Sequence, residues 1–308
     1  MTRYAFAVDL GATNVRVALV SEQGKIIQRL EQNTPRQGKS GHVVTNAVGV
    51  MLSTLQGMYA KLSVSGIGIA SLGPIDYLRG GPEQPPNLPF AFIPLVVPLQ
   101  KKFSMPVLLF NDCNAAVLAE QNFGAGKNKK NILYITISTG IGAGAIVDNN
   151  LLLGRSGNAG EIGHVIIDTT YNLPCTCGKG IGHWEGYASG RNIPRFFNAW
   201  CKKWDVRDID APNNAKDIFD RARQGNQVAL RFLDELNTIN ARAISNVIVA
   251  YDPEVITIGG SVMLGNASLL LPGIQKKVDQ YLKKPVVKMT SLGHDAGLLG
   301  AAAAVFKN

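Results

Sequence analysis

The stretch Asp9-Leu10-Gly11-Ala12-Thr13-Asn14 decides the fold, because it separates two apolar segments near the start of the chain. Residues 4–10 and 15–20 are predicted strands, so the stretch predicts a tight turn that follows a buried strand. Its glycine lets backbone amides approach phosphate oxygens closely, and its carboxylate can orient Mg²⁺ through water. Taken alone, the stretch is also compatible with an ordinary β-turn.

A second glycine-rich loop, Ser138-Thr139-Gly140-Ile141-Gly142-Ala143-Gly144, joins two further predicted strands at residues 131–138 and 143–148. Two strand-turn-strand units in one chain predict a duplicated lobe. Two such loops that face each other can hold a triphosphate from both sides. The pair is therefore a more specific signal than either loop alone.

A third glycine-bearing segment, Ile256-Thr257-Ile258-Gly259-Gly260-Ser261, ends a predicted strand at residues 255–258. Two successive glycines allow a flat ring to lie against the main chain. A tight turn from a strand into a helix explains the segment equally well.

The remaining pattern predicts an α/β protein of two lobes. The chain has 308 residues, 46% of them hydrophobic, which is enough for a substantial core. Hydrophobic periodicity predicts further strands at residues 25–30, 64–70 and 107–110, and helices at residues 42–62, 115–123, 186–202, 215–223, 228–250, 268–282 and 297–306.

Composition narrows the localisation and the partners. The sequence has no run of about 18 uncharged apolar residues and no signal-peptide core, so we expect a cytoplasmic protein that does not bind membranes. The formal net charge of +9 suits an anionic ligand such as a nucleotide. The basic cluster at residues 127–130 is typical of a solvated loop, so no nucleic-acid partner is expected.

A candidate catalytic carboxylate lies in Phe110-Asn111-Asp112-Cys113-Asn114, which ends an apolar strand and begins a helix. Asp112 occupies the position of a helix N-cap, and capping alone explains an aspartate there. The functional alternative is a general base that accepts the proton of an attacking hydroxyl, with Asn111 bonded to neighbouring sugar hydroxyls. Phosphoryl transfer mainly requires positioning and charge stabilisation, so one carboxylate beside two phosphate loops is sufficient.

The densest polar segment is Gly160-Glu161-Ile162-Gly163-His164, followed by Cys175-Thr176-Cys177-Gly178 and His183-Trp184-Glu185. The two cysteines are too closely spaced for an ordinary disulfide. Two thiolates and two imidazoles suit a tetrahedral structural zinc ion, although His183 can also be an ordinary surface imidazole. Such an ion would fix the loop so that Glu161 and Glu185 can accept hydrogen bonds from a sugar.

In this order the motifs resemble the ROK family of sugar kinases over essentially the whole chain. The matching stretches are 9–14, 73–76, 87–89, 111–114, 138–144, 160–164, 175–178, Glu185 and 259–260. The resemblance implies an actin-like ATPase fold of the hexokinase type, with two α/β lobes and an interlobe cleft. It implies an N-terminal lobe of residues 1–112 plus 297–308, onto which the final helix packs, and a C-terminal lobe of residues 113–296 with the zinc loop.

The resemblance also implies the roles of individual residues, with Asp112 as the catalytic base. It implies sugar contacts by Gly73, Asn87, Asn111, Asp112, Glu161, His164 and Glu185. It implies contacts to ATP by Asp9, Gly11, Thr13, Asn14, Ser138, Thr139, Gly140, Gly142, Gly259 and Gly260. The implied cofactors are ATP, Mg²⁺ and structural Zn²⁺, and the implied assembly is a homodimer or homotetramer.

The zinc ligands carried over from the family are His164, Cys175, Cys177 and His183. The chain departs from the usual pattern here, because His183 stands where a third cysteine is common and one additional residue precedes it. The His183-Trp184-Glu185 form resembles the variant of archaeal members. Imidazole can replace thiolate on zinc, so the site is still expected.

The resemblance implies ATP-dependent phosphorylation of a hexose, with glucose the first choice. Mannose, fructose, allose, N-acetylmannosamine and N-acetylglucosamine are alternative acceptors. A sugar-responsive ROK transcription regulator is less favoured, because such regulators carry a helix-turn-helix domain ahead of the first phosphate loop and Asp9 leaves no room for one. An actin-like ATPase that needs no sugar would not require Asn111, Glu161, His164 and Glu185.

Overall fold

The computed structural model describes residues 2–207 and 210–307, and its contacts divide the chain into two compact units. The first unit comprises the described parts of Met1–Lys129, Gly144–Ala159 and Ser291–Asn308. The second comprises Lys130–Ala143 and Gly160–Thr290. These units do not test the expected lobe boundary after residue 112, which stays a prediction.

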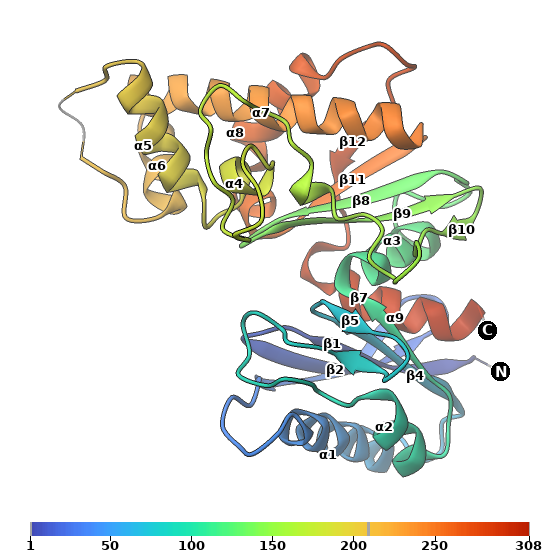
Figure 1. Ribbon diagram of the computed structural model, residues 1–308. Coiled ribbons are helices and arrows are strands. Elements are labelled where there is room, and N and C mark those ends of the chain that lie inside the picture. The colour runs from blue at the N-terminus through green and yellow to red at the C-terminus, as the bar shows by residue number, and fades with distance from the viewer. Residues whose placement is uncertain (1, 208–209, 308) are drawn as a thin grey trace. The chain divides into compact units, whose positions relative to one another are not determined.

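The first unit is built on a five-stranded sheet of order β3-β2-β1-β4-β7 (Figure 1). Its strands are β1 (Tyr4–Leu10), β2 (Asn14–Ser21), β3 (Ile26–Asn33), β4 (Val64–Ser71) and β7 (Val107–Asn111). The strands β1, β2 and β3 are antiparallel neighbours, whereas β4 runs parallel to both β1 and β7. A small hairpin of β5 (Ile75–Asp76) and β6 (Gly81–Pro82) is separate from this sheet.

Helices cover both faces of the first sheet: α1 (His42–Met58), α2 (Val96–Phe103), α3 (Asp112–Phe123) and α9 (Ala296–Lys307). Along β1, Phe6, Val8 and Leu10 enter a core with α1 and α2, whereas Ala5 and Ala7 face α3 and α9. This alternation follows from the two-residue period of a strand. The expected packing of the final helix onto the first unit is therefore confirmed.

The second sheet has the order β10-β9-β8-β11-β12, which repeats the arrangement of the first (Figure 1). Its strands are β8 (Ile132–Ile137), β9 (Ile141–Val147), β10 (Asn150–Leu151), β11 (Val255–Gly259) and β12 (Val286–Met289). In both sheets the first three strands along the chain are neighbours joined by hairpins. The two later strands are then added in parallel beside the first of them. The predicted duplication is confirmed at the level of strand order.

The second unit contains β8, β11 and β12 together with helices, and a long loop at residues 160–184 precedes the first of these helices. The helices are α4 (Glu185–Ala188), α5 (Ile193–Lys203), α6 (Ala215–Arg223), α7 (Gln227–Tyr251) and α8 (Ser261–Lys277). Two short 3₁₀ turns are η1 (Ile162–His164), which belongs to this loop, and η2 (Gly293–Asp295), which precedes α9. No helix within residues 2–207 and 210–307 is long and apolar enough to cross a bilayer.

The strands β5, β6, β10 and β12 were not predicted, and three helical segments differ clearly from the sequence-based expectation. The helix expected at 186–202 is divided into α4 and α5, because the backbone of Ser189 is extended. The helix expected at 268–282 begins earlier, at Ser261, and ends at Lys277. Helix α2 was not predicted, since its first turn includes Pro98 and follows Pro94, which obscures the helical pattern.

Candidate functional site

The first glycine turn joins β1 to β2 and is closed by its own backbone. The amide of Gly11 donates to the carbonyl oxygen of Asn14 at 3.0 Å, and a Cβ added at Gly11 would lie 3.1 Å from that oxygen. Thr34 ties the turn to the end of β3 by donating from its amide to the carbonyl oxygen of Thr13 at 2.8 Å. Thr13 and Asn14 are exposed, and Asn14 Nδ2 donates to Glu31 Oε1 at 3.0 Å. The Thr13 hydroxyl is the side-chain group that the turn presents to a phosphate ligand.

Asp9 ends β1 beside this turn and is paired with Arg16 on β2. Burial raises the pKa of Asp9, and the Arg16 guanidinium acts in the opposite direction. Asp295 and Glu31 add negative charge nearby and raise the pKa further. Arg16 is therefore the group that favours the ionised form of this carboxyl.

The junction of β7 and α3 carries the candidate base. Asn111 is the N-cap, because its side-chain oxygen accepts a hydrogen bond from the amide of Cys113 at 2.9 Å. The interpretation of Asp112 as the N-cap is thus wrong: Asp112 is the first residue of the helix and its side chain is exposed. Its Oδ1 also accepts from the Cys113 amide, at 2.8 Å.

Two further predicted sugar contacts belong to the first unit. A Cβ added at Gly73 would lie 3.4 Å from the side-chain nitrogen of Asn111, so Gly73 and Asn111 are brought together. Asn87 is exposed, and its carbonyl oxygen accepts a hydrogen bond from Arg36. No hydrogen bond in the described chain engages the Asn87 side chain, which leaves its amide available to a ligand.

In the second unit, the loop between β8 and β9 is bonded to Glu185. The amide of Ile141 donates to Glu185 Oε2 at 2.9 Å. A Cβ added at Gly140 would lie 2.7 Å from the same oxygen, so a side chain at position 140 would displace the Glu185 carboxylate. Thr139 is exposed and Gly142 is half-buried in β9. Glu185, which the sequence assigned to the sugar, thus also fixes the predicted phosphate loop.

The glycine pair at the end of β11 adjoins the same loop. Gly260 is the N-cap of α8 with a φ of 88°, and a Cβ there would lie 2.4 Å from the carbonyl oxygen of Ile137. The hydroxyls of Ser138 and Ser261 are 2.9 Å apart. The structure therefore brings Ser138, Gly259 and Gly260 together. Their joint role in nucleotide binding stays a prediction.

The three predicted sugar residues of the second unit also gather. His164 Nε2 lies 3.9 Å from Glu161 Oε2. Burial raises the pKa of Glu161, the His164 ring lowers it and the Glu185 carboxylate raises it. The carboxylates of Glu161 and Glu185 are close enough for the charge of one to affect the pKa of the other. Together they present several hydrogen-bond acceptors.

The predicted zinc ligands form one cluster. The ligand atoms of His164, Cys175, Cys177 and His183 all lie within 4.8 Å of one another. Tetrahedral zinc with these donors would separate them by about 3.3–3.8 Å, so a small contraction is sufficient. The buried Nδ1 of His164 has no hydrogen-bond partner in the described chain, which an ion would explain. The donor set and the orphaned nitrogen both fit zinc.

The surroundings of the cluster shift the pKa values of its thiol and imidazole groups in ways that affect metal binding differently. Burial raises the pKa of Cys175 to about 11, and the neighbouring Cys177 contributes to it. Burial, together with His164, lowers the pKa of His183 and keeps its imidazole neutral. A neutral imidazole can bind a metal directly, whereas the thiol must first lose its proton to the arriving ion.

Sequence reasoning missed the residue that supports this loop. Asn192 is fully buried and its Nδ2 donates to the Thr176 hydroxyl and to the Glu185 carbonyl oxygen, both at 3.0 Å. It therefore links the cysteine loop to the start of α4. A buried asparagine directly before the apolar face of α5 was the available signal.

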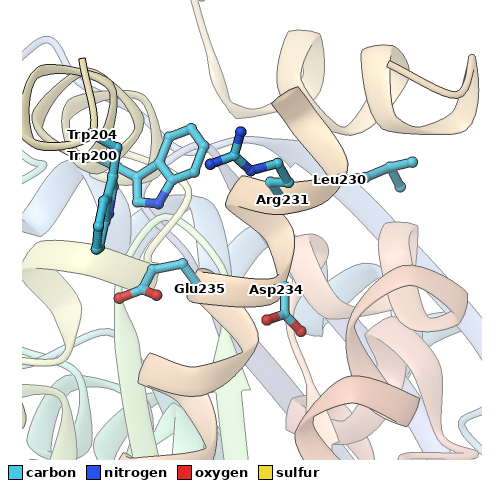
Figure 2. A pocket seen from close by; sticks show the side chains of 6 residues that line it. All are labelled: Trp200, Trp204, Leu230, Arg231, Asp234 and Glu235. Carbon is cyan, nitrogen blue, oxygen red and sulfur yellow. The ribbon is translucent and has the colours of Figure 1, made fainter. Parts of the chain in front are cut away.

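A surface cavity of about 500 Å³ lies apart from these clusters, between α5 and α7 (Figure 2). Its lining residues are Trp200, Trp204, Leu230, Arg231, Asp234 and Glu235. Tyr171 donates to Glu235 at 3.0 Å, and Lys277 pairs with Asp234 at 3.0 Å. The carboxylates are thus already engaged, and none of the lining residues was predicted as a site residue.

Comparison with known proteins identifies the family of the chain. The ROK family model matches residues 5–308. The chain is 36% identical to the glucokinase of Pyrobaculum calidifontis over 100% of its own length and 96% of that protein. It is 31% identical to the N-acetylmannosamine kinase of Haemophilus influenzae, covering 96% of this chain and 93% of that one.

A solved structure of a ROK family protein is similar to this chain in fold. The ROK family glucokinase of Streptomyces griseus, in complex with glucose and AMPPNP, matches with a TM-score of 0.77 and 29% identity, over 99% of this chain and 100% of that one. The expected actin-like α/β fold, with its two sheets, is confirmed by this match. The chain belongs to the ROK family.

Proposed function

We propose that this chain is an ATP-dependent kinase that transfers the γ-phosphoryl group of ATP to a hydroxyl of a hexose, with glucose as the preferred acceptor. The proposal is supported by membership of the ROK family and by similarity to a glucokinase over the full length of both chains. It is also supported by the two glycine loops and by the acceptor groups of Glu161 and Glu185.

The observation that carries the mechanism is the position of Asp112. Asn111 is the N-cap of α3, and the exposed Asp112 follows it as the first residue of the helix, where its Oδ1 accepts a hydrogen bond from the Cys113 amide. We assign Asp112 as the general base. The sugar oxygen bonds to the γ-phosphorus, the bond from that phosphorus to the β,γ-bridging oxygen breaks, and the hydroxyl proton passes to Asp112 and then to water. The products are a sugar phosphate and ADP.

We assign nucleotide binding to the two glycine loops and to Gly259 and Gly260. Mg²⁺ fits the first loop, because the Asp9 carboxylate lies beside exposed hydroxyl and amide groups and its Oδ1 accepts no hydrogen bond from the described chain. The ion would neutralise charge on the phosphates when bound. The residues themselves hold the phosphates and keep them in line with the acceptor hydroxyl.

We assign a structural role to zinc at His164, Cys175, Cys177 and His183. Four protein ligands leave no open position for a catalytic water. The ion would instead fix η1, whose N-cap is Glu161, and the segment that leads into α4, whose first residue is Glu185. We further propose a cytoplasmic homodimer or homotetramer, which light scattering after size-exclusion chromatography would test.

A second acceptor class is supported by the similarity to an N-acetylmannosamine kinase. The distinguishing experiment is a coupled assay of ADP release with ATP and Mg²⁺ across glucose, mannose, fructose, allose, N-acetylmannosamine and N-acetylglucosamine. Glucose should give the highest kcat/KM. A preference for an N-acetylated sugar would reassign the acceptor, and turnover that no sugar changes would replace the kinase with an ATPase. Specific operator binding in a gel-shift assay would instead favour a transcription regulator.

A further inference from the structure

Arg16 lies between two carboxylates at the edge of the first glycine turn. It is directly opposite Asp9 in the β1–β2 pairing. Its Nε donates to Asp9 Oδ2 at 3.1 Å, and its Nη2 contacts the same oxygen. Nη2 also donates to the carbonyl oxygen of His294 at 2.8 Å, and Nη1 lies 3.5 Å from Asp295 Oδ1. All three guanidinium nitrogens are thus engaged by the fold.

Asp295 is itself anchored from the other side. Arg29 on β3 donates to Asp295 Oδ1 at 2.7 Å. The side chain of Arg29 is 43% exposed, whereas those of Arg16 and Asp9 are 19% and 16% exposed. The Arg16–Asp9 pair is therefore more shielded from solvent than the Arg29–Asp295 pair.

The geometry leaves one oxygen of Asp9 unused. Arg16 engages Oδ2, and no donor within residues 2–207 and 210–307 is hydrogen-bonded to Oδ1. Gly297, in the first turn of α9, borders that oxygen closely: a Cβ added there would lie 3.2 Å from Oδ1. A side chain at position 297 would crowd the space beside Oδ1, and glycine leaves it open.

We propose that Arg16 is a positioning residue of the nucleotide site, which fixes Asp9 through Oδ2 so that Oδ1 is directed to the hydration shell of Mg²⁺. This inference rests on the proposed function. Arg16 is not assigned as a phosphate ligand, because its nitrogens are already bonded to Asp9, His294 and Asp295. We therefore expect Arg16 to affect nucleotide binding only through the position of Asp9.

The test is calorimetric binding of AMPPNP to Arg16→Gln, with and without Mg²⁺, beside a separate titration with glucose. Loss of a charge-assisted pair should weaken Mg²⁺-dependent AMPPNP binding by about tenfold or more. Binding without Mg²⁺ and binding of glucose should each change by less than about twofold. Arg29→Gln is the matched control, because it removes a neighbouring guanidinium and leaves the Arg16–Asp9 pair intact.

A double-mutant cycle separates this role from general stabilisation. Asp9→Asn should lose the same Mg²⁺-dependent part of the affinity, and adding Arg16→Gln to it should have little further effect. Wild-type Mg²⁺-dependent affinity in Arg16→Gln would overturn the inference, and so would an equal loss in every binding arm. Arg16→Lys, which keeps the charge without the fork, serves if Arg16→Gln does not fold. A wild-type protein that binds AMPPNP but phosphorylates no hexose would refute the kinase proposal and leave this test intact.

Discussion

At the scale of single residues, the base assignment is tested by Asp112→Asn. The substitution keeps the shape of the side chain and removes its ability to accept a proton. Turnover should fall by roughly 10²-fold or more, whereas the glucose dissociation constant should stay within a few fold. Steady-state ADP release and glucose titration measure the two quantities.

A matched control for this substitution is Asp217→Asn. Asp217 also lies in the first turn of a helix, α6, and is not part of either glycine-loop cluster. It should leave turnover unchanged. Near-wild-type turnover in Asp112→Asn would remove Asp112 from the mechanism.

A second prediction at this scale concerns Gly260→Ala. The positive φ and the 2.4 Å approach to Ile137 mean that a methyl group must displace backbone. We expect the affinity for ATP to fall by about tenfold or more, with a lower melting temperature. Gly265→Ala in the same helix is the control, because a Cβ there meets nothing within 4 Å. Equal behaviour of the two variants in AMPPNP titration would contradict the assignment.

The sequence located most candidate residues but not their local partners. Both Asn111 and Asp112 belong to residue types that cap helices, so the sequence could not tell which one does so. The pairing of Arg16 with Asp295 joins residues far apart in the chain. Such contacts depend on how β2 and η2 are brought together, and no local pattern encodes that.

At the scale of elements, we expect the predicted zinc loop to stabilise the positions of the predicted sugar-binding residues Glu161 and Glu185. Cys177→Ser, or chelation of the wild-type protein, should lower the melting temperature by about 5 °C or more and weaken glucose binding at the same time. Cys201→Ser is the control, because Cys201 lies in α5 outside the ligand cluster. Protein purified without chelator should contain zinc by elemental analysis, and its absence would refute the site.

Elements with a strong apolar pattern were predictable, and interrupted ones were not. Residues 215–223 were predicted as a helix and form α6 with the same bounds. The predicted bounds of α8 were wrong because Pro272 lies within this helix and Asn266 has a non-helical φ of −137°. Tertiary packing maintains this helix across its kink. The sequence pattern contains the residues that interrupt a helix, but it does not contain the packing that compensates for them.

At the scale of the whole molecule, the duplicated strand order followed from two glycine turns, each between a pair of apolar strands. What the sequence did not reveal is how closely the final helix approaches the rest of the first unit. A Cβ added at Gly68 would lie 1.9 Å from the carbonyl oxygen of Ala301. A Cβ at Gly300 would lie 1.6 Å from that of Ala115. Helix α9 is therefore rich in alanine and glycine because its backbone packs directly against β4 and α3. The small side chains do not indicate weak packing.

This contact predicts that Gly300→Ala destabilises the entire first unit. Relief of the clash requires α9 to move away from α3, and the sheet core shared by both helices would loosen. We expect a loss of about 1–3 kcal/mol in the free energy of unfolding, measured by urea denaturation. Gly57→Ala, at an exposed position in α1 with nothing within 4 Å of the added Cβ, should be neutral or stabilising by up to about 1 kcal/mol. Equal stability of Gly300→Ala and wild type would mean that α9 can shift without cost, and the packing argument would then fail.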